Sequence, residues 1–274
     1  MSDAEQPAHR PQSLMLTFFA VHMLKRGGAV SSGSVINVLG RVGVGEDAVR
    51  TTLARMVTRG LLERHRRGRK TYFGLTPRAI GVLQDGHHRV WRVGAVNRAW
   101  DGTWTVVGFS LPEAWASERH DLRSRLVWGG FGPVQNGLWI AAGRVDVASL
   151  VADLGLDSYL RVFHGQSAKP TEAVALIEAA FDLPGIAERY QAFRARWERA
   201  DALLPGADDP LARQLLLHTE WLNLVRQDPH LPAEHLPAHW PAARAEELFY
   251  ALAGRFDEPA ARLATEVLDR IDVG

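Results

Sequence analysis

A dense run of basic side chains is the clearest chemical signal in the sequence. Five of the seven positions from 64 to 70 carry a guanidinium or ammonium group, namely Arg64, Arg66, Arg67, Arg69 and Lys70. Neighbouring like charges repel one another, and the phosphates of a nucleic acid would relieve that repulsion while releasing condensed counterions. The run therefore predicts contact with DNA, and the alternative is an ordinary solvated loop.

A second group of polar side chains lies on one side of a predicted helix over residues 46–59. At the helical period, its valine, leucine and methionine residues share one face, which indicates the core side. Arg55 points away from that face and Arg50 lies at its edge, and an arginine can bind guanine or a phosphate. The alternative for Arg50 is a pair within the helix, for example with Asp47. The residues of this helix predicted to contact DNA are Asp47, Arg50, Thr51, Arg55, Thr58 and Arg59.

The elements that would position these two groups follow the order of a winged helix-turn-helix. A buried helix is predicted over residues 12–25, and a second one ends near residue 39 and is capped by a serine at position 32 or 34. After the third helix, a hairpin is predicted over 61–75 with its turn at 65–69. The third helix fits a major groove, and the hairpin can lie along the backbone or in a minor groove. The other residues predicted to contact DNA are Ser32, Ser34, Arg66, Arg67, Arg69, Lys70 and Tyr72.

The rest of the chain divides into a mixed portion and a helical portion. Strands are predicted at 104–110, 132–134, 138–141 and 159–163, with helices at 112–127 and 145–154 between them, an order typical of a ferredoxin-like domain. From Thr171 to Ile271 the pattern is helical, interrupted by a proline-rich corner. The predicted class is therefore α+β. Its three domains are a winged helix-turn-helix over 10–90, a ferredoxin-like βαββαβ domain over 98–168 and an all-helical domain over 171–274.

Charge is divided unevenly along the chain. Residues 1–99 carry 16 Lys and Arg against 6 Asp and Glu, a net charge of +10, whereas the remainder carries 16 against 25, a net charge of −9. This division favours a polyanion-binding end joined to a portion that does not bind polyanions. No run of about 18 apolar residues is present and the start is polar. We therefore expect a cytoplasmic protein without a membrane span or signal peptide.

Several short motifs, spread in one order over most of the chain, resemble those of PaaX-type transcriptional repressors. They are Arg10-Pro11-Gln12-Ser13-Leu14, residues 46–57, Gly60-Leu61-Leu62, Trp100-Asp101-Gly102-Thr103-Trp104, residues 130–133, residues 137–140, Asp228-Pro229-His230-Leu231-Pro232, Leu236-Pro237 and Trp240-Pro241. The resemblance implies a homodimeric repressor of aromatic-acid catabolic genes that binds double-stranded operator DNA. It also implies release by phenylacetyl-coenzyme A or a related aryl-acyl-coenzyme A, and it maps the DNA-contacting helix onto residues 46–59.

Aromatic and basic residues of the helical portion are the candidates for an effector site. Aromatic side chains can hold an aryl group and arginines can hold the phosphates of coenzyme A. The alternative is that the tryptophans belong to the core and the arginines to the surface. The candidate effector-binding residues are Arg196, Arg213, His218, Trp221, Arg226 and Trp240. No cofactor is predicted, and a regulator that answers to a different catabolite remains open.

Metal and catalytic chemistry are not predicted. His235 and His239 have the spacing of helical metal ligands, but Pro237 between them would break the helix. The sequence has no cysteine, which excludes a thiolate zinc site and a catalytic thiol. The central portion resembles small CRISPR-associated nucleases, which carry an aspartate at the end of the first strand. Here that strand ends in Phe109-Ser110-Leu111-Pro112, so a nucleic-acid-processing enzyme is the disfavoured alternative. A structural nucleoid protein, which would bind DNA without sequence preference, is a third alternative.

Overall fold

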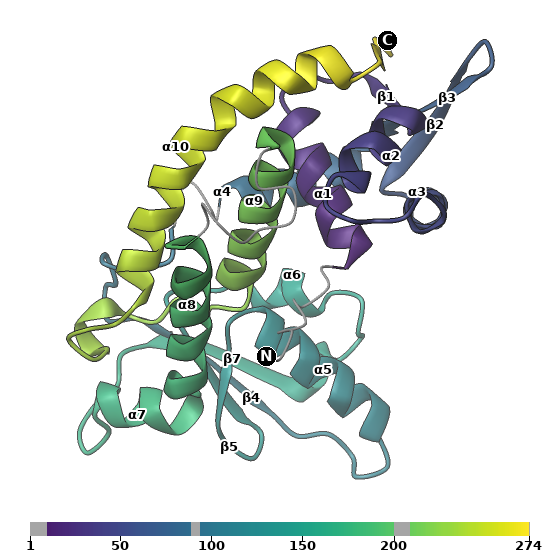
Figure 1. Cartoon of the computed structure of the whole chain (residues 1–274). Helices are drawn as coiled ribbons and strands as arrows, with labels where there is room; N and C mark the ends of the chain where they lie inside the picture. The colour runs from purple at the N-terminus through teal and green to yellow at the C-terminus, as the bar shows by residue number, and fades with distance from the viewer. Residues whose placement is uncertain (1–9, 89–93, 200–208, 274) are drawn as a thin grey trace, which may run out of the picture. The chain divides into compact units, whose positions relative to one another are not determined.

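The computed structural model describes residues 10–88, 94–199 and 209–273 (Figure 1). The chain divides into two compact units, and each is built from separate segments. The terminal unit comprises Met1–Arg92, Phe193–Asn223 and Glu247–Gly274, and the central unit comprises Val93–Ala192 and Leu224–Glu246. The described residues form a mixed α and β structure with two antiparallel four-stranded sheets, which confirms the predicted α+β class.

The N-terminal part of the terminal unit has the predicted order of three helices and a hairpin. Its elements are α1 (Pro11–His22), β1 (Ala29–Ser31), α2 (Ser32–Gly40), α3 (Glu46–Thr58), β2 (Leu62–Arg67), β3 (Lys70–Leu75) and α4 (Pro77–His88). Helix α1 is buried along Leu14, Met15, Phe18 and Phe19. The residue that caps α2 is Ser31, whose side chain accepts a hydrogen bond from the Ser34 amide at 3.2 Å. The cap was predicted at Ser32 or Ser34, so the prediction was wrong: the cap is Ser31, which precedes both.

The C-terminal end of the chain returns to the sheet of the terminal unit. Helix α10 (Ala242–Val267) ends before the predicted Ile271, and β8 (Arg270–Ile271) pairs antiparallel with β1. The sheet therefore has the order β2-β3-β1-β8. Gly28 permits the approach, because a Cβ at this position would lie 2.5 Å from the carbonyl oxygen of Ile271. The prediction of helix up to Ile271 was wrong because this pairing depends on residues more than 230 positions away in the chain.

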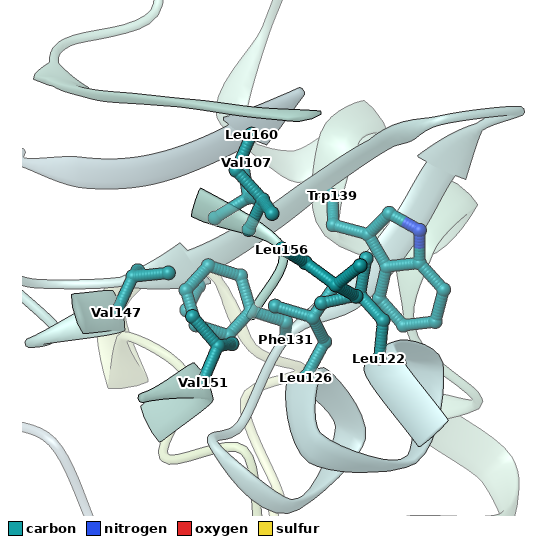
Figure 2. Packing of buried hydrophobic residues seen from close by; sticks show 10 residues of the cluster. Val107, Leu122, Leu126, Phe131, Trp139, Val147, Val151, Leu156 and Leu160 are labelled. Atoms are coloured by element: carbon teal, nitrogen blue, oxygen red, sulfur yellow. The ribbon is translucent and has the colours of Figure 1, made fainter. Parts of the chain in front are cut away.

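The central unit contains the predicted βαββαβ order. Its elements are β4 (Trp104–Phe109), α5 (Ala116–Trp128), β5 (Gly132–Gln135), β6 (Leu138–Ala142), α6 (Val147–Val151) and β7 (Leu160–Gly165). The sheet order is β5-β6-β4-β7, with every pair antiparallel. Leu122 and Leu126 of α5 pack with Val147 and Val151 of α6 in one core cluster that also includes Trp139 of β6 (Figure 2). Helix α6 is shorter than the predicted 145–154: it begins after Asp146, whose side chain accepts a hydrogen bond from the Ser149 amide as the N-cap, and it ends at Val151.

The remaining helices are α7 (Ala173–Ala180), α8 (Leu183–Trp197), α9 (Pro210–Arg226) and α10. Helices α8, α9 and α10 each contribute residues to both units. The predicted extension of α8 to residue 203 runs into residues 200–203, which lie outside the described residues. Over the described part of the chain, no helix is both long enough and apolar enough to cross a membrane.

Candidate nucleic-acid interface

Helix α3 presents a polar face to solvent, as its helical pattern predicts. Val49, Leu53 and Met56 are buried in the terminal unit, with exposures of 0%, 2% and 0%. The residues on the opposite side are exposed, and they are Asp47, Arg50, Thr51, Ala54, Arg55, Thr58 and Arg59. Gly45 stands at the N-cap in extended conformation, and Glu46 and Asp47 lie in the first turn, where carboxylates interact favourably with the helix dipole. The helix can therefore offer its polar face to a partner without losing core packing.

The side chains on this face differ in what they already bind. The Arg50 guanidinium donates to the Glu46 carboxylate at 2.8 Å from Nε, so its partner within the helix is Glu46 and not Asp47. Both partners are more than half exposed, and such a surface pair contributes at most about 1 kcal/mol. Arg59 donates to the Gln12 side chain at 3.2 Å, and the Thr58 hydroxyl donates to the Ala54 carbonyl. Arg50 and Arg59 can thus exchange weak contacts for phosphates.

Among the three arginines of this face, Arg55 has the fewest constraints. Its side chain is exposed, and the structure gives it no hydrogen bond or ion pair with another described residue. The same holds for Asp47 and Thr51, whose side chains are exposed on the same side of α3. An arginine fork without an internal partner can bind two acceptors of a guanine edge at once. Arg55 therefore has the best geometry on α3 for base recognition.

The basic run lies on a hairpin whose first strand is longer than predicted. Strands β2 and β3 continue to Arg67 and Lys70, so the turn is confined to Gly68 and Arg69 instead of covering 65–69. Gly68 has a φ of 60°, which glycine adopts without strain and which a two-residue turn of this kind requires. We call residues 62–75 the wing. The longer first strand places Arg64, Arg66 and Arg67 in the ladder with β3.

The exposed basic residues of the wing are divided between its two faces. Arg66 pairs across the ladder with Thr71, and Arg67 pairs with Lys70. Because successive side chains of a strand point to opposite faces, Arg66 lies on one face and Arg67 with Lys70 on the other. Two like charges directly opposite each other are destabilising. A phosphate or a carboxylate near Arg67 and Lys70 would offset that repulsion.

Three of the predicted DNA-contacting residues are engaged by the C-terminal end of the chain. Lys70 Nζ lies 2.8 Å from the Asp269 carboxylate, and the Tyr72 hydroxyl donates to the same carboxylate at 3.2 Å. The Ser34 hydroxyl donates to the Val267 carbonyl at 3.1 Å, and Ser34 is buried. Ser32, at the first position of α2, is half-buried. Sequence reasoning missed Asp269, because a predicted helix to residue 271 gave no sign that this carboxylate reaches the wing.

Four of the six candidate effector residues pack inside the terminal unit. Trp221 is 0% exposed and stacks on Phe249 with ring centroids 4.7 Å apart. His218 Nε2 lies 3.0 Å from the Asp257 carboxylate, and Arg196 Nε lies 3.1 Å from that of Glu220. The guanidinium of Arg213 lies 5.7 Å from the ring centroid of Phe256. The structure therefore brings these four together as packed side chains with internal partners.

The other two candidates, Arg226 and Trp240, belong to the central unit. The Arg226 guanidinium lies 5.7 Å from the ring centroid of Trp128, and Trp240 is half-buried. A cavity of about 340 Å³ in this unit is lined by Arg123, Pro133, Gln135, Asn136, Gly137 and Trp139. Sequence reasoning did not select these residues for a site, although Asn136-Gly137 was predicted as the hairpin turn between β5 and β6. Elsewhere in the described residues, no group of three or more histidines and carboxylates gathers as metal ligands would.

His22 is an ionisable group in the core of the terminal unit. It lies on α1, is 5% exposed and contacts the Phe18 ring at 5.5 Å between centroids. Burial, together with the positive charges of Arg270 and Arg26, lowers its pKa from 6.5 to about 4. The imidazole is therefore neutral at physiological pH, which avoids a buried charge.

Three family models match consecutive parts of the chain. A PaaX-like protein model matches residues 10–79, the PaaX protein central Cas2-like domain matches 97–177, and the PaaX-like protein C-terminal domain matches 181–266. A curated relative, the Transcriptional repressor PaaX of Escherichia coli (strain K12), is 29% identical over 248 residues, which cover 86% of this chain and 77% of that protein.

A solved structure shares the fold. An uncharacterized protein from Mycobacterium tuberculosis matches with a TM-score of 0.62 and 22% identity, covering 92% of this chain and 98% of that one. The three family models follow one another from residue 10 to residue 266, in the order found along this chain, and the motifs that resembled PaaX-type repressors lie within their matches or beside them. The chain belongs to the PaaX-like protein family.

Proposed function

We propose that this protein is a DNA-binding transcriptional repressor whose terminal unit carries a winged helix-turn-helix. The observation that carries the proposal is the presence of two exposed basic surfaces, the polar face of α3 and the wing, within one unit. Helix α3 would enter the major groove, and the wing would contact the backbone or the minor groove. The repressor name of the Escherichia coli relative supports a regulatory role over an enzymatic one.

The proposal includes a homodimer on a palindromic operator. A single winged helix reads only a few base pairs, so useful affinity and specificity require two half-sites. The portion from residue 100 onward is expected to supply the dimer contact. A fragment that starts at residue 100 is unsuitable for testing it, because Phe193–Asn223 and Glu247–Gly274 belong to the same compact unit as the N-terminal residues. Sedimentation of the intact chain at micromolar concentration separates monomer from dimer.

Arg55→Ala should reduce operator affinity by about 1–3 kcal/mol and relax base preference at one operator position. The physical reason is that Arg55 is exposed on α3 without an internal partner and can form a two-pronged contact with guanine. The measurement is a binding assay with operator variants and with a random duplex as competitor. Arg262→Ala is the matched control, since that arginine is exposed on α10 and pairs with Glu258 within its helix.

An equal loss of affinity on operator and random DNA would make Arg55 a phosphate contact instead of a base contact. A wild-type protein that binds random duplex as tightly as any operator would contradict the repressor proposal itself. It would favour a nucleoid-type protein, since sequence-independent binding rests on phosphates alone.

An aryl-acyl-coenzyme A thioester, with phenylacetyl-coenzyme A as the first candidate, is the proposed effector. It should bind outside the winged helix-turn-helix. The cavity of the central unit supports this placement, because Trp139, Arg123 and Asn136 could contact an aryl group, an anion and an amide respectively. Its volume of about 340 Å³ lies at the lower end of the range for ligand pockets. The internal contacts of Trp221 and His218 disfavour the aromatic cluster of the terminal unit as an open site.

Reciprocity tests the effector. A ligand that lowers operator affinity roughly 5–150-fold must itself bind the operator complex more weakly by the same factor. Calorimetric titration of phenylacetyl-coenzyme A into the protein, with and without operator, measures both sides. Arg123→Gln should weaken binding of the thioester. Without the thioester, the variant should bind the operator as tightly as the wild type does. Equal thioester affinity with and without operator would contradict the effector assignment and leave the DNA-binding assignment standing.

A further inference from the structure

The C-terminal segment, which we define as residues 267–271, is fastened to the DNA-binding surface by backbone and side-chain contacts. The Ser34 hydroxyl donates to the Val267 carbonyl and accepts from the Asp269 amide at 2.9 Å. The Ser31 amide donates to the Asp269 carbonyl at 2.9 Å, and Arg270 and Ile271 then pair with β1. The segment is therefore an integral part of the sheet that carries the wing.

The Asp269 side chain faces three groups of the wing. Its carboxylate binds Lys70 Nζ at 2.8 Å and accepts from the Tyr72 hydroxyl. The hydrogen bond from Lys70 holds the pKa of Asp269 below its usual value, and the positive charge of Arg67 acts in the same direction. The same hydrogen bond raises the pKa of Lys70. Asp269 is thus the counter-ion for the wing face on which Arg67 and Lys70 lie opposite each other.

The pair lies at the surface, where a phosphate can reach it. The Lys70 side chain is 66% exposed and that of Asp269 is 38% exposed. Exposed pairs of this kind contribute little to stability, so exchanging the carboxylate for a DNA phosphate costs little. The exchange nevertheless leaves the Asp269 carboxylate without its ion-pair partner Lys70, and the nearby DNA backbone repels this carboxylate.

We propose that Asp269 is a built-in competitor of DNA, which holds Lys70 back from the phosphate backbone and lowers affinity for every duplex alike. This inference rests on the proposed function. Phosphate contacts carry little sequence information, so Asp269 should set the overall affinity and leave the ratio of operator to random binding unchanged. The residue lies beyond the last family match, which ends at residue 266.

Asp269→Asn tests the proposal, because it removes the charge while retaining the backbone bonds of residue 269. The expected result is one additional phosphate contact, so that the slope of log affinity against log salt becomes steeper by about 0.9. The gain in affinity over wild type should then shrink roughly threefold between 50 and 200 mM salt. Asp272→Asn is the matched control: it removes the same charge three residues away, from an exposed side chain with no contact to Lys70 among the described residues.

A second variant tests whether a steeper salt slope in Asp269→Asn arises from Lys70. In a Lys70→Gln background, Asp269→Asn should leave the salt slope unchanged, because the competed group is absent. A steeper slope in that background, an unchanged slope in Asp269→Asn alone, or weaker binding by Asp269→Asn would each overturn the proposal. Weaker binding would mean that Asp269 positions Lys70 for DNA instead of competing for it. Equal thermal midpoints of the variants exclude a change in folding as the cause.

A measurement without DNA separates this inference from the proposed function. Acetylation of Lys70 requires the neutral amine, which the Asp269 hydrogen bond disfavours. The acetylation rate of Lys70, followed by mass spectrometry, should therefore rise in Asp269→Asn and stay constant in Asp272→Asn. An unchanged rate in Asp269→Asn would overturn the inference while the wild type still bound DNA. If Lys70 is acetylated faster in Asp269→Asn but the wild type binds no duplex, the proposed function is overturned. Competition between Asp269 and DNA would then be overturned as well.

Discussion

Replacing Arg66, Arg67 and Arg69 by Ala should weaken binding to every duplex and flatten its salt dependence. If each arginine contacts one phosphate, the slope of log affinity against log salt falls in magnitude by about 0.9 for each arginine removed. The ratio of wild-type to variant affinity should then change roughly 40-fold between 50 and 200 mM salt. The expectation rests on the exposure of all three side chains on a hairpin whose turn is confined to Gly68 and Arg69. The measurement is a salt titration with operator and random duplex in parallel.

The control variant loses the same number of positive charges at positions outside the wing and α3. Arg123, Arg161 and Arg262 are exposed arginines outside the wing and α3, so their triple Ala variant loses the same three charges. Its salt slope should match that of the wild type. A triple wing variant with an unchanged slope would remove the wing from the DNA interface, and α3 would then carry the binding alone.

The parts of the fold that could be predicted from the sequence are those determined by residues close together in the chain. The polar and buried faces of α3 follow from the helical period, and the βαββαβ order of the central unit follows from short apolar runs and an Asn-Gly turn. The hairpin was placed correctly, but its turn was drawn too long, because a basic strand such as β2 has no apolar face to reveal its length. Arg66 and Arg67 were therefore assigned to the turn, although both extend the ladder.

The parts that sequence reasoning missed depend on contacts between distant segments. Residues 268–271 continue a helical pattern, but contacts with Ser34 and pairing with β1 hold Arg270 and Ile271 in a strand. The pattern also cannot separate a tryptophan that holds a ligand from one that fills a core. Trp221 and Trp197 are both buried among aromatic rings, which is the more common role of that side chain.

Lowering the pH from 7.5 to 4 should destabilise the protein by about 3 kcal/mol through His22 alone. The unfolded chain gains a proton on this imidazole near pH 6.5, whereas the folded protein keeps it neutral until about pH 4. Between these values the unfolded state binds more protons, so stability is full above about pH 6.5 and falls as the pH falls. The cause is burial on α1, with Arg270 and Arg26 opposing a further positive charge.

The test compares urea unfolding of the wild type and of His22→Gln across this pH range. The variant should lose some stability at pH 7.5, where a packed ring is replaced, but its free energy of unfolding should fall less on acidification. Because the other titrating groups remain in both proteins, the difference between the two pH profiles isolates His22. Parallel profiles would show that this imidazole titrates normally. That result would contradict the burial of His22 on α1 as the cause of its lowered pKa.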